Sequence, residues 1–357
     1  MISSLSPGKL YIAGEYAVVE KGYPSIIVAI DQFIKVSLKP AEKRGSIQAF
    51  DNSPITFERI KENLVLDYRD NRLSYVINSI NVVEALAKEL GKTLKLYDLN
   101  VVSELENIDG KKYGLGSSAA VTVSTIKVLC KFYNIEMTNL KLFKLAAIVH
   151  SKINSNGSGG DLAASIYGGW ISFKTYDKEW LNEKIKELSI DKLLEINWPY
   201  LEINKLDPPR DLKLLIGWTG KPSSTTLLVD NVNKNKENNR DFYSNFLSES
   251  KTCVDKMIKA FENKDITEIQ KQIAVNRDLL IKLSKKLNVE IETPKLTKLC
   301  DIALNFNGAA KSSGAGGGDC GVALFNKDVD TEKLIIEWKQ AGISYLPLNV
   351  YFKGEVT

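Results

Sequence analysis

Residues 110–120 read GKKYGLGSSAA, a glycine- and serine-rich segment that leads into an apolar, helix-forming stretch. Glycines let the backbone approach a ligand closely, because they carry no Cβ atom. A helix that begins at Ser117 directs free N–H groups and the positive end of its dipole toward the preceding loop. The serine hydroxyls add hydrogen-bond donors, and Lys111 and Lys112 add positive charge. The segment therefore predicts a loop that cradles phosphate.

The same residues allow other interpretations. Ser117 can simply cap a core helix that follows a glycine turn. Gly114-x-Gly116-x-x-Ala119 also fits the dinucleotide fingerprint, but that fingerprint should follow a buried strand, and here it follows the charged residues 109–112. Residues 91–93, Gly-Lys-Thr, match the end of a Walker A motif, but Leu86 stands where the first glycine of that motif is required. A Walker A loop is therefore absent. An ATP site on this chain would therefore not be a P-loop.

Three further segments share this glycine-rich character: residues 7–16 (PGKLYIAGEY), 156–161 (NGSGGD) and 311–320 (KSSGAGGGDC). Each has an ordinary interpretation when taken alone. Lys9 can be a surface lysine, Asp161 can be an N-cap, and the third segment can be a strand connection. Asp161 nevertheless places a carboxylate where a helix begins.

Composition limits the class of protein. The chain has 357 residues, with 44% hydrophobic and 26% charged residues, which is ordinary for globular domains. Its 48 Lys and Arg against 44 Asp and Glu give a net charge of +4, too mild to argue for nucleic acid but suited to anionic ligands. The single histidine, His150, excludes a His-rich metal site. We expect it to be structural or exposed on a helix.

Cysteine usage and the N-terminus indicate the compartment. The four cysteines, at 130, 253, 300 and 320, form no Cys-x-x-Cys pair, so we expect buried free thiols in a reducing compartment. The first residues show no signal-peptide pattern, and no apolar run approaches about 18 residues. We expect a cytoplasmic protein that binds neither membrane nor nucleic acid and shows no sign of an obligate protein partner.

Apolar periodicity predicts an α+β chain with two domains, 1–205 and 206–357, divided near Pro208-Pro209. Residues 231–239 are polar and predict a solvated loop. Helices are predicted at 73–90, 117–133, 140–152, 161–167, 224–234, 240–262, 265–286, 294–306 and 331–341, and strands within 9–38 and at 94–105, 170–175, 212–218, 321–325 and 343–352.

The order and contents of the four glycine-rich segments resemble the GHMP kinase superfamily, which includes galactokinase, homoserine kinase, mevalonate kinase and phosphomevalonate kinase. In that family a Pro-Gly-Lys strand, a Gly-Leu-Gly-Ser-Ser-Ala loop and a Gly-Ala-Gly-Gly-Gly loop meet around ATP and the acceptor. The resemblance spans Pro7 to Cys320. It implies a two-domain fold with an N-terminal mixed β-sheet and helices, a ferredoxin-like C-terminal domain, and an active site in the cleft between them.

Within the superfamily, Gly14-Glu15-Tyr16, Lys111-Lys112-Tyr113 and Asp319 resemble the bacterial-type phosphomevalonate kinases. That likeness implies transfer of the ATP γ-phosphoryl group to (R)-5-phosphomevalonate, giving 5-diphosphomevalonate and ADP in the mevalonate route to isoprenoids. Mevalonate kinase or another small-molecule kinase of the superfamily is the alternative. A non-catalytic ligand sensor on the same fold is a remote one.

The resemblance also assigns residues. Lys9 and Asp161 match catalytic positions, and Ser117 and Ser118 are candidate Mg²⁺ ligands. ATP-binding residues are Lys111, Gly114, Leu115, Gly116, Ser117, Ser118 and Ala119. Substrate-binding residues are Lys9, Tyr16, Lys112, Ser158, Ser223, Ser224, Gly314 and Ala315.

The acceptor's chemistry refines one of these roles. A phosphate monoester has a second pKa of about 6, so it is mostly dianionic at pH 7 and needs no general base. Phosphoryl transfer then depends mainly on positioning and on charge stabilisation. We therefore expect Lys9 and Lys112 to contribute most, and Asp161 to orient its neighbours rather than to remove a proton.

Overall fold

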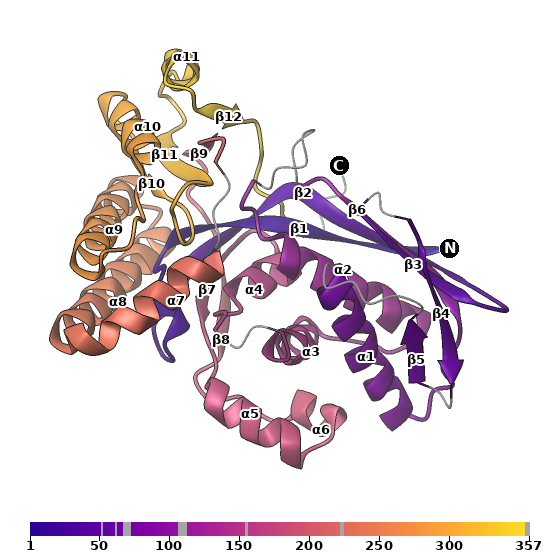
Figure 1. Ribbon diagram of the computed structural model, residues 1–357. Coiled ribbons are helices and arrows are strands. Elements are labelled where there is room, and N and C mark those ends of the chain that lie inside the picture. The colour runs from indigo at the N-terminus through magenta and orange to yellow at the C-terminus, as the bar shows by residue number, and fades with distance from the viewer. Residues whose placement is uncertain are drawn as a thin grey trace.

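The computed structural model describes residues 1–50, 53–60, 63–66, 73–105, 113–153, 156–221 and 225–353. Within them the chain forms two sheets, one in each half, with helices packed against both (Figure 1). This is the predicted two-domain α+β arrangement. No helix among the described residues is long and apolar enough to span a membrane.

The N-terminal half is built on an eight-stranded sheet. The strands pair in the order β5-β4-β3-β6-β2-β7-β8, and β1 pairs with β2 off this path. Only the β3–β6 pairing is parallel among those described, so the sheet is mixed, as predicted. The strands are β1 (Ile2–Ala13), β2 (Pro24–Pro40), β3 (Gly45–Ala49), β4 (Ile55–Ile60), β5 (Asn63–Leu66), β6 (Tyr97–Ser103), β7 (Trp170–Lys174) and β8 (Glu202–Leu206).

Strand β2 is the central strand of this sheet and pairs with three others. Its first part pairs with β7 and its second part with β6, while β1 runs antiparallel along most of its length. Its β-branched run from Ile26 to Ile30 is fully buried, which suits a strand covered on both faces. The helices of this half are α1 (Ser74–Glu89), α2 (Ser117–Phe132), α3 (Asn139–Ser151), α4 (Gly160–Tyr167), α5 (Lys178–Glu187) and α6 (Ile190–Glu195).

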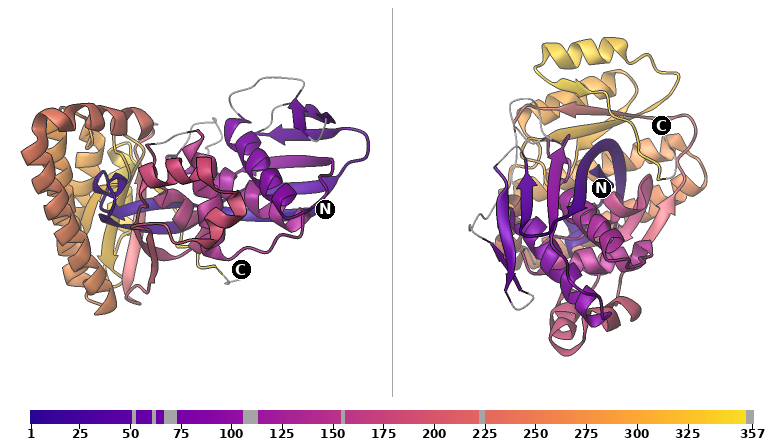
Figure 2. Two further views of the ribbon diagram at one scale, coloured as in Figure 1. Left: turned by 90° about the horizontal axis from the view of Figure 1, so that it is seen from below. Right: turned by 90° about the vertical axis from the view of Figure 1, so that its right-hand side faces the viewer.

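The C-terminal half has a four-stranded antiparallel sheet in the order β10-β11-β9-β12. Its strands are β9 (Leu212–Trp218), β10 (Ala309–Ser312), β11 (Cys320–Asn326) and β12 (Ser344–Leu346). Long helices lie along the outer side of this sheet (Figure 2). The helices are α7 (Thr225–Lys236), α8 (Arg240–Glu262), α9 (Ile266–Leu287), α10 (Pro294–Asn305) and α11 (Glu332–Gln340).

The two halves share one hydrophobic core. Apolar side chains of α8 and α9 join the cluster that is centred on the first sheet. Trp170 of β7 packs on Phe261 of α8, with ring centroids 5.2 Å apart. After β12 the chain returns to the first sheet, where the Tyr351 N–H donates to the Ala29 carbonyl at 3.0 Å. These contacts hold the halves against each other.

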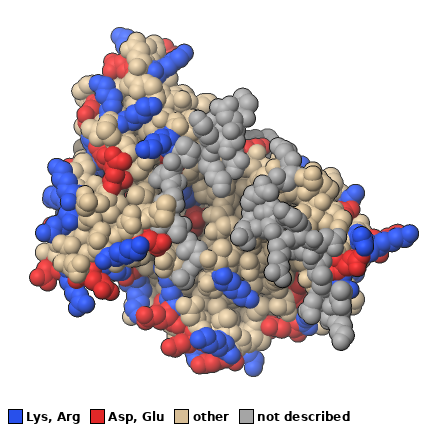
Figure 3. Space-filling view, in the orientation of Figure 1, with Lys and Arg blue, Asp and Glu red and all other residues tan. Residues whose placement is uncertain are grey.

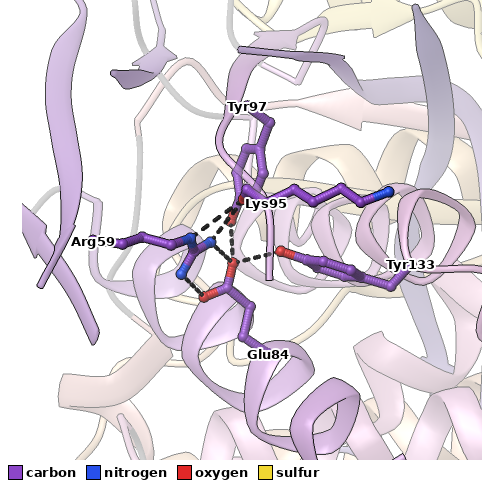
Figure 4. Close-up of polar contacts among 5 residues, drawn as sticks. All are labelled: Arg59, Glu84, Lys95, Tyr97 and Tyr133. Carbon is purple, nitrogen blue, oxygen red and sulfur yellow. Dashed lines mark hydrogen bonds and ion pairs between the residues drawn. The ribbon is translucent and has the colours of Figure 1, made fainter. Parts of the chain in front are cut away.

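A buried polar cluster fixes α1 against the sheet (Figure 4). Arg59 of β4 makes a bidentate pair with Glu84 of α1, and the hydroxyls of Tyr97 and Tyr133 both donate to Glu84 Oε1 at 2.9 Å. The guanidinium also donates to the Lys95 carbonyl. Four donors therefore compensate one carboxylate that is only 6% exposed.

Most predicted helices and strands are confirmed to within a few residues. The predicted loop at 231–239 is wrong, because α7 runs to Lys236 and a 3-10 turn continues to Asn239. Val232 is buried there, Asn235 donates to the Leu287 carbonyl, and Lys236 pairs with Glu20.

Other elements differ in extent or escaped prediction. The predicted strand 343–352 is also wrong in length, since only β12 (Ser344–Leu346) pairs with β9. Helices α5 and α6 and strand β8 were not predicted. Strand β8 belongs to the first sheet and β9 to the second, while the domain bounds 1–205 and 206–357 stay a prediction. The four cysteines are free and buried, as predicted.

Candidate active site

A cavity of about 380 Å³ lies where the four glycine-rich segments converge. It is lined by Lys9 and Tyr11 of β1, by residues 114–118, by residues 156–158 with Asp161, and by residues of the 314–319 turn. Figure 3 shows a hollow near the centre of one face, with acidic and basic atoms at its bottom and charges of both signs interspersed around it. Segments separated by up to about 300 positions in sequence thus form one site.

The loop before α2 has the geometry of an anion cradle. Gly114 and Gly116 have φ angles of 80° and 82°, in the left-handed region that glycine adopts without strain. Gly116 is the N-cap of α2 and offers no side-chain cap, so the alternative that Ser117 is the cap is wrong. The first amides of α2 therefore lack a side-chain acceptor at the edge of the cavity, which leaves them for a ligand.

Lys9 packs against this loop and forms hydrogen bonds with it. The Lys9 backbone N–H donates to the Leu115 carbonyl at 2.9 Å, and its ammonium donates to the Gly114 carbonyl at 3.4 Å. A Cβ atom on Gly116 would lie 2.9 Å from Lys9 Cε, so glycine leaves the room that the lysine stem occupies. The side chain is 9% exposed and lines the cavity. Lys9 is therefore a buried, positioned cation and not a surface lysine.

Asp161 lies in the first turn of α4 and lines the same cavity as the glycine turn that precedes α2. Its Oδ1 accepts from the Leu162 N–H at 3.0 Å, and the N-cap of the helix is Gly159, so the N-cap interpretation of Asp161 is wrong. Neither Asp161 nor Lys9 forms an ion pair with another described residue. Both charges are therefore left for ligands.

Neutral groups surround the Asp161 carboxylate. Burial raises the pKa of Tyr11 and of Tyr176 well above the usual range, and the Asp161 charge acts in the same direction on both. Burial and the same charge raise the pKa of Tyr75, and the Ser118 side chain opposes this shift. These tyrosines stay protonated at neutral pH. They can donate hydrogen bonds but cannot act as bases.

The hydroxyl pair of Tyr11 and Ser158 forms part of the same wall. Their oxygens are 2.8 Å apart, and Ser158 Oγ also accepts from the Gly160 N–H at 3.2 Å. A Cβ atom on Gly160 would lie 2.4 Å from the Tyr11 hydroxyl. The glycine run before α4 thus lets β1 and the helix start approach closely enough to join these hydroxyls.

His150 lines the cavity, which the expectation of a structural or exposed histidine missed. Its Nε2 is 3.1 Å from Thr122 Oγ1, whose only proton goes to the Ser118 carbonyl at 2.8 Å. Burial lowers the pKa of His150, and the Asp161 charge opposes this shift. No motif in the sequence marks this residue, because its position in the cavity depends on how α3 packs beside α2.

Contacts between the two halves position the part of the cavity wall that comes from the C-terminal half. Glu15 and Lys311 form an ion pair that is almost wholly buried, with exposures of 2% and 0%. The Tyr16 hydroxyl donates to the Ala315 carbonyl at 2.5 Å, and Ser313 Oγ donates to the Tyr11 carbonyl at 2.9 Å. The 313–319 turn is thereby tied to the strand that carries Lys9.

The cavity collects most of the predicted site residues. Among the predicted site residues that the structure describes, Ala119 is the exception, since it is buried in α2 and does not line the cavity. Lys111, Lys112, Ser223 and Ser224 lie outside the described residues. The predicted residues that line the cavity are Lys9, Gly114, Leu115, Gly116, Ser117, Ser118, Tyr16, Ser158, Asp161, Gly314 and Ala315. Lining residues that were not predicted include Tyr11, Glu15, Val18, Val19, Tyr75, Leu105, His150, Asn156, Val229 and Asp319.

The comparisons with known proteins extend over nearly the whole chain. Residues 74–169 match the family of GHMP kinases N terminal domains, and residues 257–344 match the GHMP kinases C terminal family. A phosphomevalonate kinase of Streptomyces sp. (strain CL190) is 36% identical over 98% of this chain and 97% of its own length. A mevalonate kinase of Methanocaldococcus jannaschii is 28% identical over 92% of this chain and 93% of its own.

Solved structures agree with these matches. The structure described as Streptococcus pneumoniae phosphomevalonate kinase in complex with phosphomevalonate and AMPPNP superposes with a TM-score of 0.86 at 30% identity, covering 98% of this chain and all of the other. A protein from Listeria innocua superposes with a TM-score of 0.91 at 36% identity, covering 99% of each chain.

The fit between Gly116 and Lys9 yields a stability prediction. Gly116→Ala should lower the free energy of unfolding for two reasons. An alanine in the left-handed backbone region costs about 1–2 kcal/mol, and the overlap of its Cβ with the Lys9 side chain costs about 1–3 kcal/mol. Gly91→Ala is the matched control, because Gly91 has a φ of 69° but nothing within 4 Å of an added Cβ. Urea denaturation of both variants measures the difference, and equal losses would contradict the proposed fit.

Proposed function

The chain belongs to the GHMP kinases, and from that membership we propose that it transfers the γ-phosphoryl group of ATP to 5-phosphomevalonate, giving 5-diphosphomevalonate and ADP. The observation that carries the proposal is the end-to-end match to a phosphomevalonate kinase whose structure holds phosphomevalonate and AMPPNP. The cavity supports it, since an uncapped helix start, a positioned lysine and a free carboxylate face one space.

ATP binds, in this proposal, with its phosphates against residues 114–118. Two features support this placement: the left-handed glycines bring the backbone close, and the amides that begin α2 have no side-chain acceptor. The dipole of α2 adds a partial positive charge at the same end. The loop thus binds phosphate mainly through backbone groups, and the hydroxyls of Ser117 and Ser118 supply further polar atoms.

Lys9 is proposed as the main charge-stabilising group. Transfer brings two polyanions together, so the protein must offset the repulsion between them and the charge on the moving phosphoryl group. The Lys9 ammonium is held by the Gly114 carbonyl and by the packing of its stem on Gly116. A cation fixed before the reaction needs no reorganisation during it, which is what makes such groups effective.

Asp161 is proposed to orient groups rather than to act as a base. The acceptor phosphate is already mostly dianionic at pH 7, so it has little proton to give up. The carboxylate is surrounded by protonated tyrosines and by His150, all of which can be aligned by its charge. Its free oxygens can hold the acceptor, Lys9 or a metal-bound water.

The donor set also fits Mg²⁺, which prefers a few protein oxygens together with phosphates and water. The Ser117 or Ser118 hydroxyl is the proposed protein ligand, and the Asp161 carboxylate would hold a metal-bound water, since all three residues line the cavity. When bound, the ion would neutralise charge on the ATP phosphates. The described residues contain no group of three or more His, Cys, Asp or Glu that could hold a metal, consistent with a site completed by the nucleotide.

Tyr16, Ser158, Gly314 and Ala315 stay proposed acceptor-side residues, and all four line the cavity. The Tyr16 hydroxyl already donates to the Ala315 carbonyl, so it would shape the pocket rather than bind the acceptor directly.

We place the reaction in the cytoplasm, where four buried free thiols remain reduced.

A coupled ADP-release assay tests the proposed reaction. With ATP and Mg²⁺, we expect turnover with 5-phosphomevalonate to exceed that with mevalonate by at least about tenfold, because a cationic acceptor pocket left without its phosphate keeps its charge unpaired. Homoserine and galactose serve as negative controls. Equal or faster turnover of mevalonate would make the chain a mevalonate kinase, like several relatives at 27–29% identity. Absence of turnover with all four would favour the ligand-sensor alternative.

Lys9→Ala should lower kcat by roughly 10²–10³-fold, the usual cost of removing one preorganised charge stabiliser. The fold should survive, since the side chain lines a cavity and makes one long hydrogen bond. Steady-state kinetics with circular dichroism as the folding check measures both. Lys35→Ala, at an exposed position of β2, is the control for loss of one charge. A folded Lys9→Ala protein with normal kcat would exclude the assigned role.

Asp161→Asn separates the two roles of the carboxylate. Asn keeps an oxygen for the Leu162 N–H and removes the charge. We expect a slower enzyme whose kcat–pH profile keeps its shape, since an orienting group does not exchange a proton with the acceptor. Asp278→Asn, on the exposed side of α9, controls for loss of a carboxylate. Disappearance of an acid limb that the wild-type profile shows, with chemistry rate-limiting, would identify a base instead.

A further inference from the structure

A second cavity, of about 500 Å³, lies at the other end of the helices that begin at the candidate active site. Helix α2 starts at Ser117 in the first cavity and carries Lys127 and Lys131 to the second. Its 16 residues span about 24 Å at 1.5 Å per residue. Helix α4 likewise begins beside Asp161 and ends with Ser165 and Ile166 in this second cavity. The two cavities are therefore separate sites.

Three lysines from two distant parts of the chain line the second cavity. Lys127 and Lys131 are one turn apart on α2, and Lys353 comes from the tail that returns to the first sheet after β12. Hydrogen bonds fix this tail, since the Gly169 N–H donates to the Tyr351 carbonyl at 2.6 Å. The backbone that leads to Lys353 is thus anchored to the first sheet.

The partners of these three ammonium groups are all neutral. Lys127 donates to the Leu5 carbonyl and to Ser6 Oγ, both at 3.4 Å, and Lys131 donates to the Ser3 carbonyl at 3.2 Å. Lys353 donates to Asn139 Oδ1 at 2.8 Å. No carboxylate lies among the residues that line this cavity. Among the described residues that line the cavity, the three lysines therefore have no carboxylate as a counter-charge.

The three charges act on one another. The pKa of Lys127 is lowered to about 7, first by burial and then by the charges of Lys353 and Lys131. Like charges that share a partly desolvated space repel, which costs stability unless an anion offsets them. The helix dipole explains a lysine in the last turn of α2, such as Lys131, but it does not explain why Lys353 is brought to the same place.

We propose that this cavity is a binding site for a small anion that carries a phosphate or diphosphate group. Lysines bind phosphate as point charges, and three of them here face one space. The hydroxyls of Ser4 and Tyr351 line the same cavity and can supply further donors, whereas Ser165 Oγ already donates to the Pro7 carbonyl at 2.8 Å. Its volume lies within the range of small-molecule sites, about 300–1,000 Å³. Because the site lies beyond the far end of α2, its ligand does not compete with the ligands of the first cavity.

Calorimetric titration with sodium pyrophosphate tests the site. The wild-type chain, saturated with AMPPNP, is compared with the triple variant Lys127→Gln, Lys131→Gln, Lys353→Gln and with the control Lys35→Gln, Lys43→Gln, Lys259→Gln. The control removes the same charge from exposed positions outside the cavity. Because hydrogen bonds from a charged donor to phosphate are stronger than those between neutral groups, we expect at least about tenfold weaker binding in the cavity variant and unchanged binding in the control.

Binding that is equally strong in the cavity variant and in the wild type would overturn the proposal, as would equal weakening in the control variant. If the triple variant fails to fold, Lys353→Gln alone is the second test, since this lysine is exposed and lies in the tail. It should still weaken pyrophosphate binding several-fold, and added NaCl should weaken binding more in the wild type than in this variant. Unchanged affinity in folded Lys353→Gln would equally overturn the proposal.

Discussion

The buried ion pair between Glu15 and Lys311 is the constraint on which the site depends. It joins the end of the lysine-bearing strand to β10 of the other half, and both side chains are almost wholly excluded from solvent. The Lys311 ammonium also donates to the Ser312 carbonyl at 2.6 Å. Two buried charges are costly to desolvate, so either one without its partner would strongly destabilise the interface. The pair therefore permits one arrangement of the two halves.

The glycine-rich turns fit together because that arrangement is fixed. Gly114 faces Asp319 so closely that a Cβ atom would lie 2.4 Å from the carboxyl carbon, and Gly316 faces the Ile291 carbonyl in the same way. The Cys320 thiol donates to the Tyr113 carbonyl at 3.2 Å, and Tyr113 packs edge-on against Trp218. The loops thus need glycine both for left-handed backbone and for close contact with one another.

Sequence reasoning succeeded where the signal is local. Helix α8 shows the apolar period along its length, and the sequence places its bounds at 240–262, as observed. It also named the four segments that meet in the cavity, because glycine runs and charged residues at a helix start have direct physical meaning. It failed at 231–239, whose polar residues become helical through tertiary contacts such as the buried Val232. It also missed His150, because only the packing of α3 beside α2 turns that ring toward the cavity.

The chemistry proposed for this site is placed on one rigid half of the molecule. Lys9 is in the middle of a strand paired along its length with β2, and Asp161 is in the first turn of a helix that packs on that strand. The C-terminal half contributes the turn 314–319 to the wall and lends apolar side chains to the shared core. Groups that must stabilise a moving phosphoryl group are effective only when their positions are held before the reaction. The long β1–β2 hairpin supplies that rigidity, while the second half, bound through Glu15, completes the enclosure of the ligands.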